Sequence, residues 1–299
     1  MVREGLVALN EFMDIGSALA MATERLRAGS DSARLDAELL LSRALDVNRS
    51  YFFAHPEDML DPDAGRRFLS LVERRASGEP MSYITGEREF WSMNLMVSPA
   101  TLVPRPETEL LVERALMLIG RKAAMRILDL GTGSGAIALA IARERPLCEV
   151  VATDLSEDAL AIARQNARQL DVPNVAFACG DWVDPVKGQR FDLIVSNPPY
   201  VAEADETLAL LRHEPRSALC AGNDGLDAIR RIAQTAGEVL ADDGRLLLEH
   251  GSMQREAVAA ELQRTGWSQV ECFNDHGGLP RVTVARKATA DAHPPAIGR

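Results

Sequence analysis

The sequence is poor in the residues that build disulfide frameworks and metal sites. Its 299 residues include 4 cysteines and 5 histidines, all scattered, without a C-x-x-C pair or metal-ligand spacing. Cys148, Cys179, Cys220 and Cys272 are therefore expected to be ordinary thiols of a reduced cytoplasm, which excludes a disulfide scaffold and disfavours a zinc site. We accordingly expect a cytoplasmic protein without a bound metal.

Long apolar runs and an excess of positive charge are also absent. No stretch approaches the ~20 apolar residues of a membrane helix, and Glu4, Glu11 and Asp14 interrupt the segment where a signal peptide would have its apolar core. Lysine and arginine number 33 against 44 acidic residues, a net charge of −11. Because sequence-independent binding to nucleic acid needs a basic surface, no tight nucleic-acid binding is expected. No heptad run argues for an obligate oligomer, so we expect a monomer.

The length of the chain is enough for two domains, and the first of them is expected to be helical. Within residues 1–78, the spacing of Ile15, Leu19, Ala22 and Leu26 is that of one helix face. Two more helices are expected within residues 30–46 and 61–78. This bundle has no titratable cluster and no glycine loop. We interpret it as a substrate-recognition domain, with a structural appendage as the open alternative.

The pattern changes twice after the bundle. Residues 79–104 predict a β-hairpin linker, with a strand-like pattern from Tyr83 to Val97. From residue 105 to 286, strands and helices alternate with short connections, which predicts an α/β fold with a doubly wound, mostly parallel seven-stranded sheet. The last two strands follow each other without a helix and predict an antiparallel hairpin. The polar tail 287–299 is expected to be disordered.

A glycine-rich loop follows the first strand of the predicted sheet, in the segment LDLGTGSGAIA. Glycines at a helix N-terminus let the backbone approach a ligand closely, at the carboxyl edge of the sheet. We expect the loop to bind a cofactor through Gly131, Thr132, Gly133, Ser134 and Gly135. With Ala136 it also satisfies the dinucleotide form G-x-G-x-x-A, so a nicotinamide cofactor remains the alternative for this loop.

Acidic side chains end the neighbouring strands and point to an adenosine. Asp129 ends the first strand, Asp154 the second, and Asp181 follows the third together with Trp182. Asp154 can accept from both ribose hydroxyls and Asp181 from an adenine amino group, while Trp182 can pack on the ring. The structural alternatives are a helix N-cap at Asp154, although Ser156 can fill that role, and a turn acid beside a core indole. The set resembles the AdoMet site of class I methyltransferases.

The stretch VSNPPY follows the fourth strand and places Asn197 beside the same crevice. Pro198 and Pro199 end the strand and set a rigid corner. The motif is similar to the N/D-P-P-Y/F motif of methyltransferases that act on planar nitrogens, namely adenine N6, exocyclic cytosine or a glutamine amide. The Asn197 oxygen and the Pro198 carbonyl can each accept one N–H, which turns the nitrogen lone pair toward the methyl donor. Tyr200 can pack against the planar group.

The sequence of the linker distinguishes between these target groups. Its segment YITGEREFWSMNLMVSPATLVPRPETELLVE resembles the signature of the release-factor glutamine methyltransferases, the HemK/PrmC family, and the resemblance covers nearly the whole chain. It implies a Rossmann-like class I methyltransferase fold and methyl transfer from AdoMet to the N5 amide of the Gly-Gly-Gln glutamine in peptide chain release factors. It also implies cofactor contacts at the glycine loop, Asp154, Trp182 and Asn197, and substrate contacts from Asn197 to Tyr200.

Several alternatives stay open at this point. Phe90 and Arg105 are candidate walls of the glutamine pocket, but equally a core aromatic and a solvated or ion-paired arginine. An adenine-N6 nucleic-acid methyltransferase and a ribosomal-protein glutamine methyltransferase would share the NPPY motif, although the latter typically departs from PRPETE. A non-enzymatic AdoMet-binding module is the third possibility.

Overall fold

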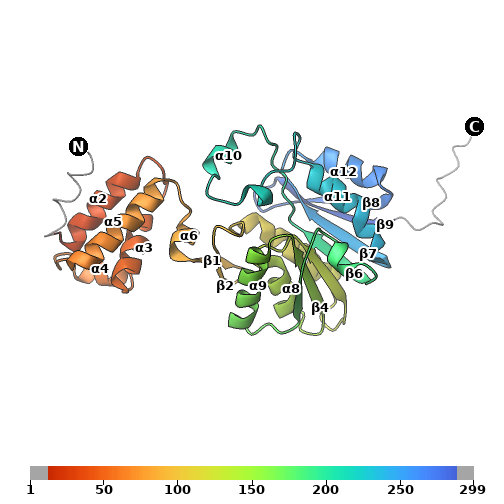
Figure 1. Cartoon of the computed structure of the whole chain (residues 1–299), viewed down its shortest axis with the longest axis horizontal. Coiled ribbons are helices and arrows are strands. Elements are labelled where there is room, and N and C mark those ends of the chain that lie inside the picture. The colour runs from red at the N-terminus through yellow and green to blue at the C-terminus, as the bar shows by residue number, and fades with distance from the viewer. Residues whose placement is uncertain (1–12, 288–299) are drawn as a thin grey trace, which may run out of the picture. The chain divides into compact units, whose positions relative to one another are not determined.

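The computed structural model describes residues 13–287, which divide into two compact units. The first unit ends at Gly86 and the second begins at Glu87. The N-terminal unit is helical and the C-terminal unit is built around a sheet (Figure 1). The tail predicted to be disordered lies outside the described residues from 288 onward, and Lys287 itself still belongs to the last strand.

The N-terminal unit is a bundle in which α2, α3 and α5 pack on one another (Figure 1). Its helices are α2 (Ile15–Leu26), α3 (Ala33–Leu45), α4 (Ser50–Ala54), α5 (Pro62–Ala76) and α6 (Met81–Thr85). The predicted face of α2 is buried in the bundle core together with Leu41 and Phe68. The short helix α4, which the pattern did not predict, buries Phe52. An apolar face buried between helices is what stabilises each of them.

The hairpin of the linker is shorter than its sequence pattern predicted. Strands β1 (Glu87–Phe90) and β2 (Met93–Met96) pair antiparallel, but Tyr83 and Ile84 belong to α6 and are buried there. Gly86 ends α6 with a φ of 82°. Aromatic and β-branched residues favour strands only when the surroundings supply a strand partner, and here burial in a helical turn overrides that preference.

The C-terminal unit holds the predicted seven-stranded sheet, in the order β5-β4-β3-β6-β7-β9-β8. Its strands are β3 (Arg126–Leu130), β4 (Glu149–Asp154), β5 (Val175–Cys179), β6 (Phe191–Ser196), β7 (Leu240–Glu249), β8 (Trp267–Asn274) and β9 (Pro280–Lys287). Strands β3 to β7 pair in parallel, whereas β9 is antiparallel to both β7 and β8. The expected fold class, including the antiparallel terminal hairpin, is confirmed.

Helices cover both faces of this sheet (Figure 1). The helices of this unit are α7 (Glu109–Leu118), α8 (Ala136–Glu144), α9 (Glu157–Gln169), α10 (Thr207–Leu210), α11 (Asp227–Thr235) and α12 (Arg255–Arg264), with 3-10 turns η1 (Pro106–Thr108), η2 (Asp184–Val186), η3 (Arg216–Ala218) and η4 (Ala236–Glu238). The short helix α10 has no buried residue and lies in a loop away from the sheet (Figure 1). One apolar cluster joins α7 and α8 to one face, and a second joins α11 and α12 to the other. Side chains alternate between the two, so Ile127 of β3 lies in the first cluster and Leu128 in the second.

The chain order in the sheet reverses at β3. The chain runs outward from β3 through β4 to β5 and then returns to β6 on the other side of β3. In an open parallel sheet, ligands bind beyond the carboxyl ends of the strands at such a switch point. The loops after β3 and β6, which carry the glycine motif and the NPPY motif, therefore meet at the expected place.

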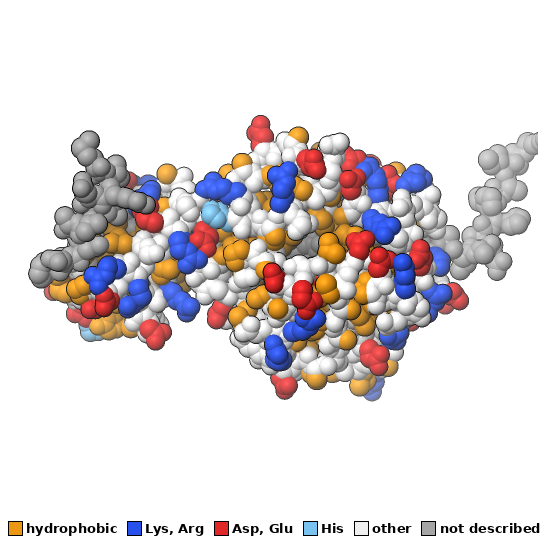
Figure 2. Space-filling model, viewed as in Figure 1, with side chains coloured by type: hydrophobic (Ala, Val, Ile, Leu, Met, Phe, Trp, Pro, Cys, Tyr) orange, Lys and Arg blue, Asp and Glu red, His pale blue; other side chains and the backbone are white. Residues whose placement is uncertain are grey.

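Two whole-molecule properties bear on possible partners. None of the helices within residues 13–287 is both long and apolar enough to cross a membrane. On the face shown in Figure 2, basic and acidic side chains are interspersed over both units, with no continuous basic stripe. That face lacks the electrostatic footprint of a nucleic-acid-binding surface.

Candidate active site

A cavity of about 530 Å³ lies at the switch point of the sheet. Most of the residues that the sequence singled out line it together. They are Gly131, Thr132, Gly133, Ser134, Asp154, Asp181, Trp182, Asn197 and Pro199. They come from the ends of four adjacent strands, which explains why residues far apart in the sequence share one site.

The glycine loop takes a backbone conformation that other residues adopt only with strain. Gly131, Gly133 and Gly135 have φ values of 71°, 56° and 85°. The N–H groups of Gly131 and Thr132 both donate to the Thr153 carbonyl at 2.9 Å, which fixes the loop to the end of β4. A Cβ on Gly131 would lie 3.4 Å from the Trp182 ring. The loop is thus a tight cradle with the indole directly against it.

Asp154 joins the glycine loop to the start of α9. Its Oδ2 accepts the Gly133 N–H at 2.8 Å and its Oδ1 accepts the Ser156 N–H at 2.9 Å. Ser156 caps α9 by accepting the Ala159 N–H at 3.1 Å, so the N-cap of this helix is Ser156 and not Asp154. A carboxylate has about four acceptor positions, so Asp154 keeps capacity for two further donors from a ligand in the cavity.

Asp129 lies beneath the loop and does not line the cavity. Its side chain is fully buried, and its Oδ2 accepts the Thr132 hydroxyl at 2.6 Å. Its Oδ1 has no hydrogen-bond partner among the described residues. Burial raises the pKa of Asp129 to about 7, although the hydrogen bond from Thr132 acts in the opposite direction. The geometry makes Asp129 a support of the loop.

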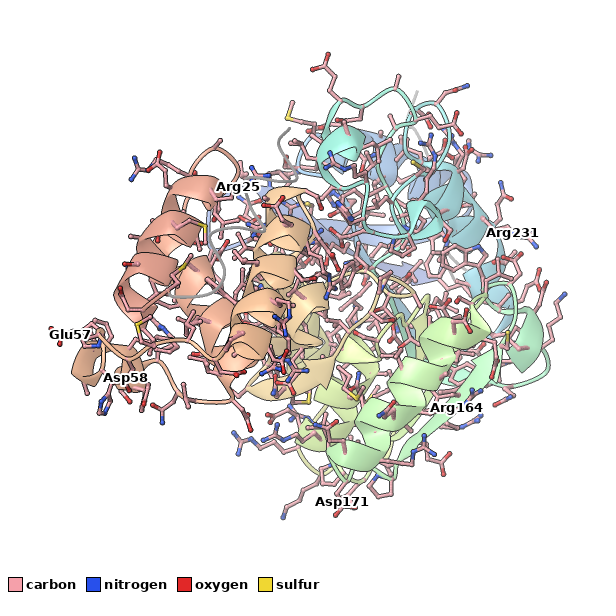
Figure 3. The ribbon with its side chains drawn as sticks, turned by 60° about the vertical axis from the view of Figure 1, so that its left-hand side comes forward. Arg25, Glu57, Asp58, Arg164, Asp171 and Arg231 are labelled. Atoms are coloured by element: carbon pink, nitrogen blue, oxygen red, sulfur yellow. The ribbon has the colours of Figure 1, made fainter. Side chains whose placement is uncertain are left out.

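Asp181 and Trp182 form the wall after β5. The Asp181 side chain is about half exposed and lies 3.4 Å from a guanidinium nitrogen of Arg231. Arg231, labelled in Figure 3, belongs to α11. The Trp182 indole is partly buried against the second apolar cluster and faces the glycine loop. One side of the cavity is thus flat and apolar, with a carboxylate at its outer end.

The four residues of the NPPY motif have different surroundings. The Asn197 Nδ2 donates to the Thr108 hydroxyl at 3.2 Å, which leaves the carboxamide oxygen for a ligand. Pro199 lines the cavity and Pro198 is buried. The Tyr200 hydroxyl lies 3.5 Å from Glu249, and its burial raises the pKa of this phenol to about 12. Tyr200 is not part of the cavity lining.

Charge on the cavity lining selects between the two cofactor classes left open by the glycine motif. Every charged side chain that lines the cavity is acidic, namely Asp154, Asp158 and Asp181. A dinucleotide would place two phosphates here, and phosphates are bound through arginine, lysine or free backbone N–H groups. A cationic ligand with a nucleoside moiety fits this lining better. Among the residues 13–287, no cluster of three or more side chains could hold a metal ion.

Comparison with known proteins agrees with this chemistry. Residues 17–86 match the family model "PrmC N-terminal domain" and residues 121–276 match the model "Methyltransferase domain". A release factor glutamine methyltransferase of Salmonella typhimurium is 49% identical over 92% of this chain and 99% of its own length. Those of Coxiella burnetii and Escherichia coli are 45% and 44% identical, over 92% and 90% of this chain and 99% and 97% of their own.

The chain belongs to the release factor glutamine methyltransferase family. Solved structures agree on the fold. A methyltransferase from Pyrococcus furiosus has a TM-score of 0.51 at 19% identity, covering 66% of this chain and 90% of its own. A T. thermophilus 16S rRNA methyltransferase, in complex with AdoMet and guanosine, has a TM-score of 0.52 at 18% identity, covering 67% of this chain and 49% of its own. These likenesses show the class of fold.

The two candidate wall residues of the linker lie elsewhere in this methyltransferase. Phe90 is 1% exposed in the first apolar cluster and does not line the cavity, which matches the alternative of a core aromatic. Arg105 forms an ion pair with Glu214, and Glu214 also accepts the Val103 N–H at 3.0 Å. Arg105 therefore holds the linker rather than facing the cavity.

Sequence reasoning missed Thr108 and Glu214, which join the linker to the rest of the site. Thr108 lies within PRPETE and lines the cavity. Glu214 is buried. Pro104, between the two linker residues that Glu214 contacts, and Pro215, which follows Glu214, both line the cavity. The only local signal for Glu214 in the sequence is a glutamate followed by a proline within a long connection.

We expect Glu214→Gln to raise the Kd of this methyltransferase for AdoMet about tenfold, which corresponds to about 1.4 kcal/mol. The neutral amide loses the charge on its hydrogen bonds to Val103 and Arg105, so the linker wall of the cavity loosens. Isothermal calorimetry measures the Kd. Glu203→Gln, an exposed residue of the same connection, is the control, and an unchanged Kd in Glu214→Gln would contradict this role.

Proposed function

We propose that this methyltransferase transfers a methyl group from AdoMet to the side-chain amide N5 of the glutamine in the Gly-Gly-Gln motif of peptide chain release factors. The relatives of 44% to 49% identity that carry the name release factor glutamine methyltransferase support this substrate. The observation that carries the chemistry is the Asn197 carboxamide at the cavity, whose Nδ2 is engaged by Thr108 and whose oxygen is left as an acceptor.

The residues of the cavity fit AdoMet. Its sulfonium supplies an activated methyl group. The glycine loop Gly131–Gly135 lets a ligand approach the protein backbone closely. Asp154 keeps two free acceptor positions, and Trp182 offers a flat apolar wall for an adenine. The acidic lining suits a ligand with positive charge on its sulfur and its amino group.

The chain's own contribution to the reaction is orientation and electrostatic stabilisation. An amide nitrogen is a poor nucleophile because its lone pair is delocalised into the carbonyl. The Asn197 oxygen accepts one N–H of the substrate amide and the Pro198 carbonyl accepts the other, which directs the lone pair toward the methyl group. Both acceptors also stabilise the positive charge that develops on nitrogen. The methylated nitrogen is then acidic enough to lose its proton without a strong base.

Mass spectrometry tests the proposal. Purified release factor, incubated with this methyltransferase and AdoMet, is expected to gain the mass of one methyl group on the Gly-Gly-Gln glutamine. A protein that binds AdoMet but does not modify release factor would contradict the proposal, and ribosomal protein and adenine-containing DNA would then be tested. The net charge of −11 disfavours the DNA alternative, whose activity would fall steeply with salt.

The helical bundle is proposed to recognise the release factor. Phe53, in α4, is 73% exposed, and Met59, in the loop after α4, is 56% exposed. Large exposed apolar side chains are common anchors of protein interfaces. We expect Phe53→Ser to raise the KM for whole release factor about tenfold and to leave the KM for a short Gly-Gly-Gln peptide unchanged. An equal effect on both substrates would contradict recognition by the bundle.

A further inference from the structure

Asn166 of α9 is a buried polar side chain that the proposed mechanism does not use. It is 0% exposed, although asparagine is mostly found at protein surfaces and enters a core when its amide is hydrogen-bonded. Asparagine is also a poor helix former in the interior of a helix. Helix α9 contacts strand β2 of the linker hairpin (Figure 1), and the partners of Asn166 lie on that side.

The side-chain amide of Asn166 forms three hydrogen bonds to two separate segments. Its Oδ1 accepts the Met96 N–H at 2.8 Å, and its Nδ2 donates to the Met96 carbonyl at 3.0 Å. The same Nδ2 donates to the Ser134 carbonyl at 2.9 Å. These bonds fix the orientation of the amide, because a flipped side chain would place its NH₂ group against the Met96 N–H.

Both segments lead to walls of the cavity. Ser134 belongs to the glycine loop and lines the cavity itself. Met96 ends β2 and is not part of the lining, but residues 100–102, which follow a few positions later, are. We call residues 100–102 the linker wall. One buried side chain therefore bonds the glycine loop and the strand that leads into the linker wall.

The other anchors of the glycine loop come from the sheet. The Gly131 and Thr132 N–H groups donate to the Thr153 carbonyl, and the Gly133 N–H donates to Asp154. Both acceptors belong to β4, so these bonds fix the loop to the sheet without involving the linker. The bonds of Asn166 add a connection between the loop and the linker hairpin.

We propose that Asn166 is a positioning residue that fixes the linker wall to the glycine loop, so that the two walls keep one spacing across the cavity. In the proposed function the glycine loop holds AdoMet, and Asn197 lines the same cavity. A change in this spacing moves the methyl donor relative to its acceptor. This inference rests on the proposed binding of AdoMet and does not depend on which protein accepts the methyl group.

The same bonds couple the linker hairpin to the cofactor. AdoMet that binds to the glycine loop stabilises the position of Ser134, and through Asn166 it stabilises Met96. The Met96 N–H bonds to Asn166 and belongs to a residue outside the cavity lining, so its protection against hydrogen exchange reports the connection. We expect AdoMet to slow exchange at this N–H about tenfold in the wild-type protein.

The test compares Asn166→Asp with the wild-type protein. The carboxylate is nearly isosteric and still accepts the Met96 N–H, but it has no N–H for the carbonyls of Met96 and Ser134 and places negative charge against both. We expect the Kd for AdoMet to rise about 10- to 100-fold. At saturating AdoMet, kcat on release factor is expected to fall about tenfold. The effect of AdoMet on exchange at Met96 is expected to disappear.

Asn174→Asp is the matched control, because it makes the same change away from the cavity. The Asn174 Nδ2 donates to the Ala142 carbonyl at 3.1 Å and to the Cys148 carbonyl at 3.0 Å, and neither residue lines the cavity. Both variants are expected to have a lower Tm than the wild type. Only Asn166→Asp is expected to change the Kd for AdoMet and the exchange at Met96 by more than about twofold.

Three outcomes would overturn the positioning role: an unchanged Kd in Asn166→Asp, an equal rise of the Kd in the control, or exchange at Met96 that still slows when AdoMet binds. Asn166→Ser, a neutral and shorter side chain that cannot reach both segments, replaces Asn166→Asp if that variant does not fold. Wild-type protein that binds no AdoMet would instead overturn the proposed function. Exchange without ligand, expected to be faster at Met96 and Gly135 in the variant, would then still test the connection.

Discussion

Asn197→Ala is expected to lower kcat about 100- to 1000-fold, while the Kd for AdoMet changes by less than about threefold. The removed oxygen accepts an N–H whose nitrogen becomes positively charged during methyl transfer. Loss of one such oriented partner costs about 2.7–4 kcal/mol in the transition state. In the proposed site the cofactor is held mainly by the glycine loop, Asp154 and Trp182, which keep their contacts in this variant.

Single-turnover kinetics with release factor and calorimetry with AdoMet measure the two quantities separately. The matched control is Asn94→Ala, the same change at an exposed position of β2, for which kcat is expected to stay within twofold. Equal losses of cofactor binding and turnover in Asn197→Ala would mean that Asn197 serves the cofactor, and that the acceptor role assigned to its oxygen is wrong.

Asp154→Ala is expected to raise the Kd for AdoMet at least about 100-fold, or about 2.7 kcal/mol. A hydrogen bond to a charged group contributes about 1.5–3 kcal/mol, and the carboxylate has room for two ribose hydroxyls. The variant also loses the bonds that tie the Gly133 N–H and the Ser156 N–H to one side chain. The glycine loop therefore loses one of its supports together with a ligand contact.

This prediction is tested by calorimetry and by the dependence of rate on AdoMet concentration. At saturating AdoMet, kcat is expected to recover to within about tenfold of wild type, because Asp154 does not contact the reacting amide. Asp242→Ala, which removes an exposed acid of β7, serves as the control. A Kd within a few-fold of wild type would show that Asp154 supports the glycine loop and does not bind the cofactor.

Local pattern was sufficient for much of the architecture. The spacing of Ile15, Leu19, Ala22 and Leu26 predicted the buried face of α2 because helical periodicity is a property of neighbouring residues. Alternating strands and helices predicted the doubly wound sheet for the same reason. The pattern failed at Tyr83 and Ile84, where burial in the helical turn α6 outweighed a strand-like composition over a few residues.

For the candidate site, too, local sequence predicted some features and not others. Glycines with positive φ and the two prolines of NPPY constrain their own backbone, so the sequence alone located the glycine loop, which we predict to bind the cofactor, and the corner after β6. The sequence also placed Asp154 and Asn197 at one edge, since parallel strands end together. It could not place Phe90 in the core or Asp129 beneath the loop, because a residue's depth depends on which helices cover it.

The amino-acid sequence by itself determined the class of fold and predicted the cofactor loop and the planar-nitrogen chemistry of this protein, because each depends on short-range periodicity and backbone preference. Only the tertiary structure decided the partners of the side chains in and around the cavity. Arg105 meets Glu214 across 109 positions and Asn197 meets Thr108 across 89. Such contacts are set by strand register and helix packing, which bring together residues whose separation in the chain carries no local signal.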